Sequence, residues 1–264
     1  MAERINAVKT SFFGKGAIRL LGPELQKMGI RRALLVTDRF LYDSGAAARV
    51  GQVLSDAGVE YAVYYNVQPN PTVQVVNDCI AAARTLQVQL LVALGGGSAI
   101  DTAKAIANGA CYDGDPWDLF EGKGKNDHVL PLGVIVTIPA AGSEMSDSSV
   151  ITREDDLCKR GRNTPLNYPK FSILNPEYTF SLPAFQTACG AVDIMAHMME
   201  RYFTNTESVE LIDRMTEGAL KTVIHNATIV LRQPEDYDAR AELMWAAALS
   251  HGPRHGLGQP QAGA

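Results

Sequence analysis

The sequence has few cysteines, no excess of positive charge and no long apolar run. Its four cysteines, Cys79, Cys111, Cys158 and Cys189, form no Cys-x-x-Cys pair and indicate neither a thiolate zinc site nor a disulfide framework. The 264 residues carry a net charge of −5 with scattered lysines and arginines, which argues against a nucleic-acid surface. The first twenty residues lack the apolar core of a signal peptide, and no other run approaches a membrane span. We therefore expect a soluble cytoplasmic protein that binds neither nucleic acid nor membrane.

Short apolar runs alternate with amphipathic stretches up to residue 181. The runs whose composition fits buried strands are residues 32–37, 61–65, 90–94, 132–139 and 171–176. This alternation predicts an α/β fold with a parallel sheet. From Leu182 onward the spacing of apolar residues is helical only. We therefore expect an α/β domain at residues 1–181 and a partial all-helical domain at residues 182–264.

A glycine-rich turn separates the run Leu90–Leu94 from a helical pattern. Three glycines follow that run, and the helical spacing begins near Ile100. Glycine lets the backbone approach a ligand, and Ser98 can cap the helix. Unpaired N–H groups and the positive end of the helix dipole then favour a phosphate above the turn. The turn predicts a nucleotide site, although a turn that only packs helix against strand is the alternative.

Two polar residues follow other expected strands. Asp38 comes directly after residues 32–37, where a carboxylate can accept both hydroxyls of an adenosine ribose and repel a 2′-phosphate. It can equally cap the helix that follows. Asn70 stands between Pro69 and Pro71, which fix the backbone around its amide. Its pattern fits a ligand contact or simply a rigid turn.

The expected helical domain contains one pair of metal-binding residue types at helical spacing. Asp193 and His197 are four residues apart, so they project from one helix face and can share a divalent cation. A solvent-facing pair without a metal is the alternative, since this spacing is common. The apolar residues farther along, Met215, Leu220 and Val223, are expected to lie in the core.

Taken together, these motifs resemble a known family. The stretch Gly95–Lys104, Gly-Gly-Gly-Ser-x-x-Asp-x-x-Lys, is similar to the pyrophosphate signature of the iron-containing (group III) alcohol dehydrogenases. Asp193 and His197 resemble the first two metal ligands of that family. The resemblance runs from Phe13 to about His251, and its later part is similar to the butanol dehydrogenases.

The resemblance implies a function and a cofactor. It implies a dehydroquinate-synthase-like fold, with a dinucleotide-binding domain before a helical metal-binding domain. It also implies an oxidoreductase that interconverts a primary alcohol and its aldehyde, with Fe²⁺ or Zn²⁺ as Lewis acid. Asp38 favours NAD over NADP. The other cofactor contacts that it implies are Asn70, Gly96, Gly97, Ser98, Ser146 and Lys159.

Some positions leave alternatives open. Lys159, in a hairpin-like polar stretch, could contact the ribose or be one more solvated charge. Ala141 replaces an expected threonine, which removes a hydrogen bond with a net contribution of about 1 kcal/mol. No side-chain general base is evident.

The family pattern breaks near the carboxyl end of the sequence. The resemblance implies two further histidine ligands from helices beyond residue 264, so we expect a truncated chain. We also expect a homo-oligomer, whose assembly would cover apolar helix faces. His251 or His255 could supply a third ligand; alternatively the tail from Gly252 is out of register. The other functions considered are a nucleotide-binding remnant with little activity and a dehydroquinate-synthase-like lyase, which would require a strongly basic pocket.

Overall fold

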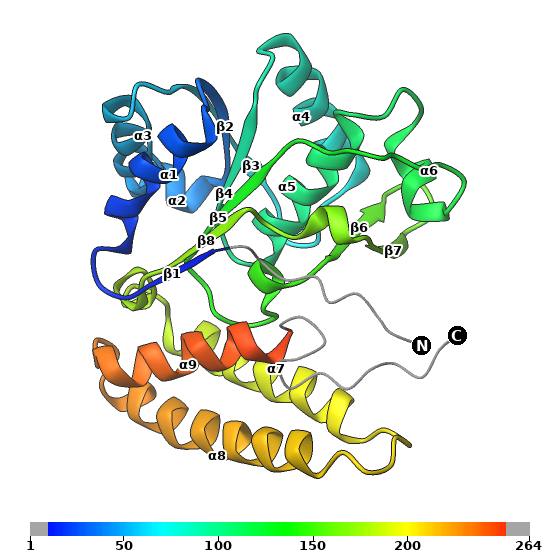
Figure 1. Ribbon diagram of the computed structural model, residues 1–264. Coiled ribbons are helices and arrows are strands. Elements are labelled where there is room, and N and C mark those ends of the chain that lie inside the picture. The colour runs from blue at the N-terminus through cyan, green and yellow to red at the C-terminus, as the bar shows by residue number, and fades with distance from the viewer. Residues whose placement is uncertain (1–9, 252–264) are drawn as a thin grey trace.

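A six-stranded parallel sheet forms the centre of the computed structural model, which describes residues 10–251 (Figure 1). Its strand order is β1-β8-β5-β4-β2-β3, and every neighbouring pair is parallel. The strands are β1 Ser11–Phe13, β2 Arg32–Asp38, β3 Glu60–Val67, β4 Leu90–Gly95, β5 Leu132–Val136 and β8 Phe171–Leu174. The α/β prediction is confirmed, although the short β1 was missed.

Helices cover both faces of this sheet (Figure 1). Alternate residues of a strand point to opposite faces, so Leu34 and Val36 belong to one core cluster and Leu35 to the other. Because both faces are buried, the strands read as continuous apolar runs. The covering helices are α1 Leu21–Met28, α2 Arg39–Asp43 and α3 Ala46–Asp56 on one side, and α4 Val73–Thr85, α5 Gly97–Gly109 and α6 Pro116–Glu121 on the other.

An antiparallel hairpin lies beside α5. It consists of β6 Ser148–Arg153 and β7 Cys158–Asn163. The backbone N–H of Thr152 donates to the carbonyl of Pro71 at 2.8 Å, and Thr72 forms an isolated bridge with Thr152. These contacts hold the hairpin against the segment that precedes α4.

Three helices form a separate layer with a core of its own (Figure 1). They are α7 Ala184–Tyr202, α8 Glu210–Arg232 and α9 Tyr237–Ser250. Val223 is fully buried as expected, whereas Met215 is 41% exposed, so its assignment to the core was wrong. Leu220 is partly buried and packs against this core. The domain boundary at residue 182 stays a prediction.

Among the described residues, none of the helices combines the length and the apolar character needed to cross a membrane.

Candidate functional site

The chain changes direction across the sheet between β2 and β4. β3 adds outside β2 on one side, while β5 adds outside β4 on the other. Ligands of open α/β sheets bind at the carboxyl ends of the strands at such a point. Asp38 ends β2 and Gly95 ends β4, and the Thr37 hydroxyl joins the two strands by donating to the Leu94 carbonyl at 2.9 Å. The structure thus brings Asp38 and the glycine turn to neighbouring strand ends.

The glycine turn contains one strained position and one open position. Gly95 has a φ of +154°, and a Cβ built on it would lie 2.7 Å from the Ala99 side chain. A Cβ built on Gly97 would meet nothing within 4 Å. Gly96 and Gly97 are partly exposed, and α5 begins at Gly97 with first-turn N–H groups that lack partners within the helix. This open cradle fits a phosphate.

Ser98 does not cap α5, contrary to the prediction. Gly96 occupies the N-cap position without any side-chain capping bond, and Ser98 is the second residue of the helix. The helix begins earlier than expected because Gly97 itself adopts the helical conformation. Ser98 is partly exposed at the turn, so its contact with a cofactor stays a prediction.

Asp38 has a structural partner. Its Oδ1 accepts the backbone N–H of Leu41 at 2.8 Å and caps α2. This is the capping alternative that the sequence left open. A ribose contact by the same carboxylate stays a prediction.

Asn70 and Lys159 meet although 89 residues separate them. The Lys159 Nζ donates to Asn70 Oδ1 at 3.0 Å. Asn70 has a φ of +56°, in the left-handed region that asparagine tolerates better than most residues. Lys159 lies exposed on β7. The hydrogen bond between Asn70 and Lys159 joins the hairpin to the turn before α4, so these two residues, each predicted to contact the cofactor, lie together.

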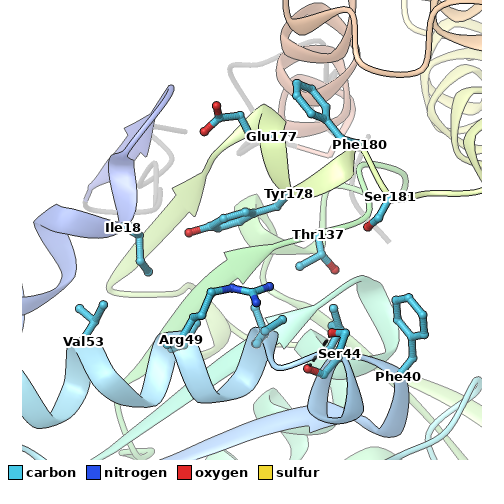
Figure 2. A pocket seen from close by; sticks show the side chains of 14 residues that line it. Ile18, Phe40, Ser44, Arg49, Val53, Thr137, Glu177, Tyr178, Phe180 and Ser181 are labelled. Atoms are coloured by element: carbon cyan, nitrogen blue, oxygen red, sulfur yellow. Dashed lines mark hydrogen bonds between the residues drawn. The ribbon is translucent and has the colours of Figure 1, made fainter.

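A cavity of about 470 Å³ opens beside the glycine turn (Figure 2). Leu94 and Thr137 line it from the strand ends, and Leu41 and Arg49 line it from α2 and α3. Figure 2 shows Tyr178, from the short helical turn Pro176–Thr179, on the opposite wall. Most of the lining is apolar, and among the described residues Arg49 is its one cation and Glu177 its one carboxylate. The cavity can receive a flat, largely apolar ligand group.

Hydrogen bonds between side chains hold the loop after β5 against α5. Ser146 is 2% exposed, and its Oγ lies 3.2 Å from the Lys104 Nζ and 3.3 Å from the Ser148 N–H. The hydroxyl therefore points into the protein, and its predicted contact with the cofactor stays a prediction. No local pattern around Lys104 indicates which groups contact its side chain.

Glu144 in this loop is a buried carboxyl with an unpaired oxygen. It is 3% exposed, and its Oε1 makes no hydrogen bond. Burial raises the pKa of Glu144 to about 7, while the charge of Lys104 opposes that rise. The folded state thus prefers the neutral carboxyl at mildly acidic pH.

The raised pKa of Glu144 makes the stability of the fold depend on pH. Because the folded pKa lies above the ordinary value of 4.5, the contribution of this carboxyl to the free energy of unfolding is complete below pH 4.5 and is lost as pH rises through about 7. We expect the free energy of unfolding of the wild type, relative to Glu144→Gln, to fall by about 3 kcal/mol between pH 4.5 and 8. Urea unfolding across this range measures it. Glu60→Gln, at an exposed carboxyl, is the control; parallel curves for wild type and Glu144→Gln would contradict the prediction.

The two predicted metal ligands face each other on α7. Asp193 Oδ1 and His197 Nε2 are 3.7 Å apart, with side chains 46% and 26% exposed. Donors at about 2.0–2.2 Å from one ion lie at nearly this separation. The pair fits two positions in the coordination shell of a divalent cation.

His251 lies next to this pair. Its ring centre is 5.2 Å from that of His197, and its Nδ1 is buried without a hydrogen-bond partner. Burial and the nearby charge of Arg201 lower the pKa of His251 to about 3, which keeps the imidazole neutral. Within residues 10–251, no set of three or more His, Cys, Asp or Glu residues is arranged to hold an ion. His255 lies outside the described residues.

Two glycines bring the α/β part and the helices into direct backbone contact. A Cβ on Gly190 of α7 would lie 2.7 Å from the Pro139 carbonyl oxygen, after β5. Gly142, with a φ of +65°, has the Ala247 carbonyl and the His251 side chain where its own side chain would be. The loop 139–148 therefore lies between α5, which begins at the glycine turn, and the helix that carries Asp193.

These features define an α/β protein with an open glycine turn that fits a phosphate, and an adjoining helical layer that bears an Asp193–His197 pair at a spacing that fits a divalent cation. Residues 9–176 match the family described as iron-containing alcohol dehydrogenase, and residues 187–263 match the C-terminal part of that family. The chain belongs to the iron-containing alcohol dehydrogenase family.

Several relatives are similar over most of this chain. NADH-dependent butanol dehydrogenase B of Clostridium acetobutylicum is 42% identical over 90% of this chain and 61% of its own length. The NADPH-dependent aldehyde reductase of Escherichia coli is 35% identical over 94% and 64%, respectively. The crystal structure of NADH-dependent butanol dehydrogenase A from Thermotoga maritima superimposes with a TM-score of 0.91 at 35% identity, covering 97% of this chain and 66% of that one. The chain thus spans less than two thirds of the length of these relatives, and the dehydroquinate-synthase-like fold is confirmed.

Proposed function

We propose that this chain binds NAD(H) and provides part of a metal-dependent oxidoreductase that interconverts a primary alcohol and its aldehyde. The observation that carries the proposal is the open Gly97 cradle at the carboxyl end of β4, joined through the loop 139–148 to the helix of Asp193 and His197. The named activities of the relatives, NADH-dependent and NADPH-dependent, support a nicotinamide cofactor.

The cofactor end of the site is assigned to residues of the α/β part. The backbone at Gly96 and Gly97 would hold the pyrophosphate at the start of α5. The cavity beside Leu94 would receive the adenine end, and Asp38, at the end of the neighbouring strand β2, would accept ribose hydroxyls. We assign NAD over NADP because a 2′-phosphate would meet this carboxylate. Asn70 and Lys159 would contact the cofactor from the hairpin side.

The metal end is assigned to α7. Asp193 and His197 would hold Fe²⁺ or Zn²⁺, which when bound supplies Lewis-acid polarisation of the substrate oxygen. The side-chain spacing of 3.7 Å keeps both donors on one helix face. His251, neutral and with an unpaired Nδ1, is the third donor that we propose within the described residues.

A nucleotide-binding protein without dehydrogenase activity is the second candidate. It is favoured because, among residues 10–251, no three His, Cys, Asp or Glu side chains are arranged to hold an ion, and Asp193 and His197 supply only two donors. Two ligands hold a catalytic cation weakly where three or four are usual.

Calorimetric titration with NAD, with and without Fe²⁺ or Zn²⁺, separates the two candidates. It is combined with metal analysis of the purified protein and with butanol-dependent NADH formation. An oxidoreductase requires NAD binding, bound metal and butanol-dependent NADH formation that depends on the ion. The double variant Asp193→Ala/His197→Ala should lose the metal and the activity but keep NAD binding. His225→Ala, at an exposed histidine of α8, is the control. NAD binding without metal or turnover supports the second candidate, and absence of NAD binding refutes both.

A further inference from the structure

Lys104 is a fully buried cation with an unusual number of oxygen partners. It lies on α5, and its side chain is 0% exposed. Its Nζ lies within hydrogen-bonding distance of the carbonyl oxygens of Ser143, Ser146 and Ser148, at 2.7, 3.0 and 2.7 Å. It also lies 3.0 and 3.2 Å from the hydroxyls of Ser143 and Ser146. All five oxygens belong to one short segment of the loop after β5.

This environment requires the protonated amine. A lysine ammonium has three N–H donors and no acceptor, so carbonyl oxygens suit the charged form. Burial lowers the pKa of Lys104 to about 8, and the charge of Asp101 opposes the decrease. At neutral pH the ammonium therefore persists inside the protein, and its donors are shared among the loop oxygens.

Asp101 binds the same loop one helical turn earlier. Its Oδ1 accepts the Ser143 hydroxyl at 2.7 Å, and its Oδ2 accepts the Val150 N–H at 3.1 Å. Residues three apart lie on one helix face, so Lys104 and Asp101 form one binding surface on α5. One group supplies only donors and the other only acceptors, so together they fix both kinds of backbone group in residues 143–150.

Both α5 and the loop that Lys104 and Asp101 bind lie at the border of the proposed site. α5 begins at the glycine turn, and the loop adjoins Gly142, which packs on α9 beside His251. We propose that Lys104 is a positioning residue whose ammonium pins the segment Ser143–Ser148 to α5, and so holds the loop between the nucleotide turn and the metal-bearing helix in place. The effect on cofactor affinity rests on the proposed function, whereas the pinning itself does not.

The competing explanation is that Lys104 and Asp101 only stabilise the fold. A buried ion pair can often be replaced by apolar side chains with no loss of stability, while removal of one partner is costly. Lys104→Met leaves the Asp101 carboxylate without its cation, and this variant can fail to fold. The double variant Asp101→Asn/Lys104→Met removes both charges and keeps the volume of both side chains, which separates stability from loop position.

Amide hydrogen exchange of residues 142–150, measured without any nucleotide, tests the pinning. We expect the double variant to unfold at a temperature close to that of the wild type, while these amides exchange at least about tenfold faster, since hydrogen bonds to a charged group are lost. Ser146→Ala, which removes one hydroxyl acceptor, should produce a smaller increase in the same amides. Lys221→Met, at an exposed lysine of α8, is the matched control.

Calorimetry with NAD provides the second measurement. A positioning role requires that the double variant bind NAD roughly tenfold more weakly at wild-type thermal stability. Unchanged amide exchange in residues 142–150 of the double variant would overturn the proposal. The proposal would also be overturned if the double variant had both the thermal stability and the NAD affinity of the wild type. If the wild type binds no NAD, the proposed function fails, and the exchange data still decide whether Lys104 pins the loop.

Discussion

Replacing Gly97 by alanine is expected to weaken NAD binding roughly ten- to a hundredfold in a protein that remains fully folded. The added methyl meets no protein atom within 4 Å, so it projects into the space where the pyrophosphate would approach the backbone. A methyl forced into a closely packed contact costs about 1–3 kcal/mol, which corresponds to that loss of affinity. Calorimetric titration with NAD measures the change.

The same substitution should not destabilise the fold. Gly97 is helical, and alanine is favoured over glycine in a helix by up to about 1 kcal/mol. Gly218→Ala provides a matched control, because Gly218 lies within α8 and a Cβ there also meets nothing within 4 Å. Both variants should unfold at or slightly above the wild-type temperature, and only Gly97→Ala should lose affinity. Equal NAD affinity in the two variants would refute the assignment of the pyrophosphate to this turn.

Replacing Gly190 by alanine is expected to lower the stability of the fold, unlike Gly97→Ala, and to weaken metal binding. Its Cβ would lie 2.7 Å from the Pro139 carbonyl oxygen, and a backbone oxygen cannot turn aside as a flexible side chain can. Helix propensity favours alanine by about 1 kcal/mol, whereas overpacking costs about 1–3 kcal/mol, so the clash should decide the sign. Asp193 lies one turn farther along α7 and must move with the helix.

Two measurements check the Gly190→Ala prediction. Thermal unfolding should show a lower midpoint than for Gly218→Ala, and a titration with Zn²⁺ should show weaker binding than the wild type. An unfolding midpoint equal to that of the wild type would mean that α7 has room to move away from the loop without cost, and the close contact would then carry no constraint.

Local patterns in the sequence were sufficient for most of the elements and for bringing several of the predicted site residues together. The apolar runs identified five strands of the sheet: β2, β4, β5 and β8 are buried and need few polar residues, whereas the edge strand β3 is only partly buried. The glycines at 95–97 and Asp38 were placed at strand ends, and the structure has them at neighbouring strands. Asp193 and His197 needed only the helical repeat to be placed together.

Other features depend on contacts between distant segments and could not be read locally. The acceptors of Lys104 are mostly backbone carbonyls of residues about 40 positions away. Every residue has such a carbonyl, so residue types do not reveal which ones the lysine contacts. The contact of His251 with His197 requires α9 to pack on α7. The pairing of Asn70 with Lys159 requires the hairpin to fold back on the turn before α4. Met215 shows how a local pattern can mislead. Helical spacing predicts which residues share a face, but not whether another element packs on that face.

The contacts at Gly142 and Gly190 have a consequence for how this protein can change over time. Because main chain meets main chain at both positions, the distance between the loop 139–148 and the helices α7 and α9 is set mainly by backbone atoms. Substitutions of the surrounding side chains can therefore accumulate while the alignment of the two parts persists. An insertion of a single residue into the loop 139–148 would disturb that alignment at once.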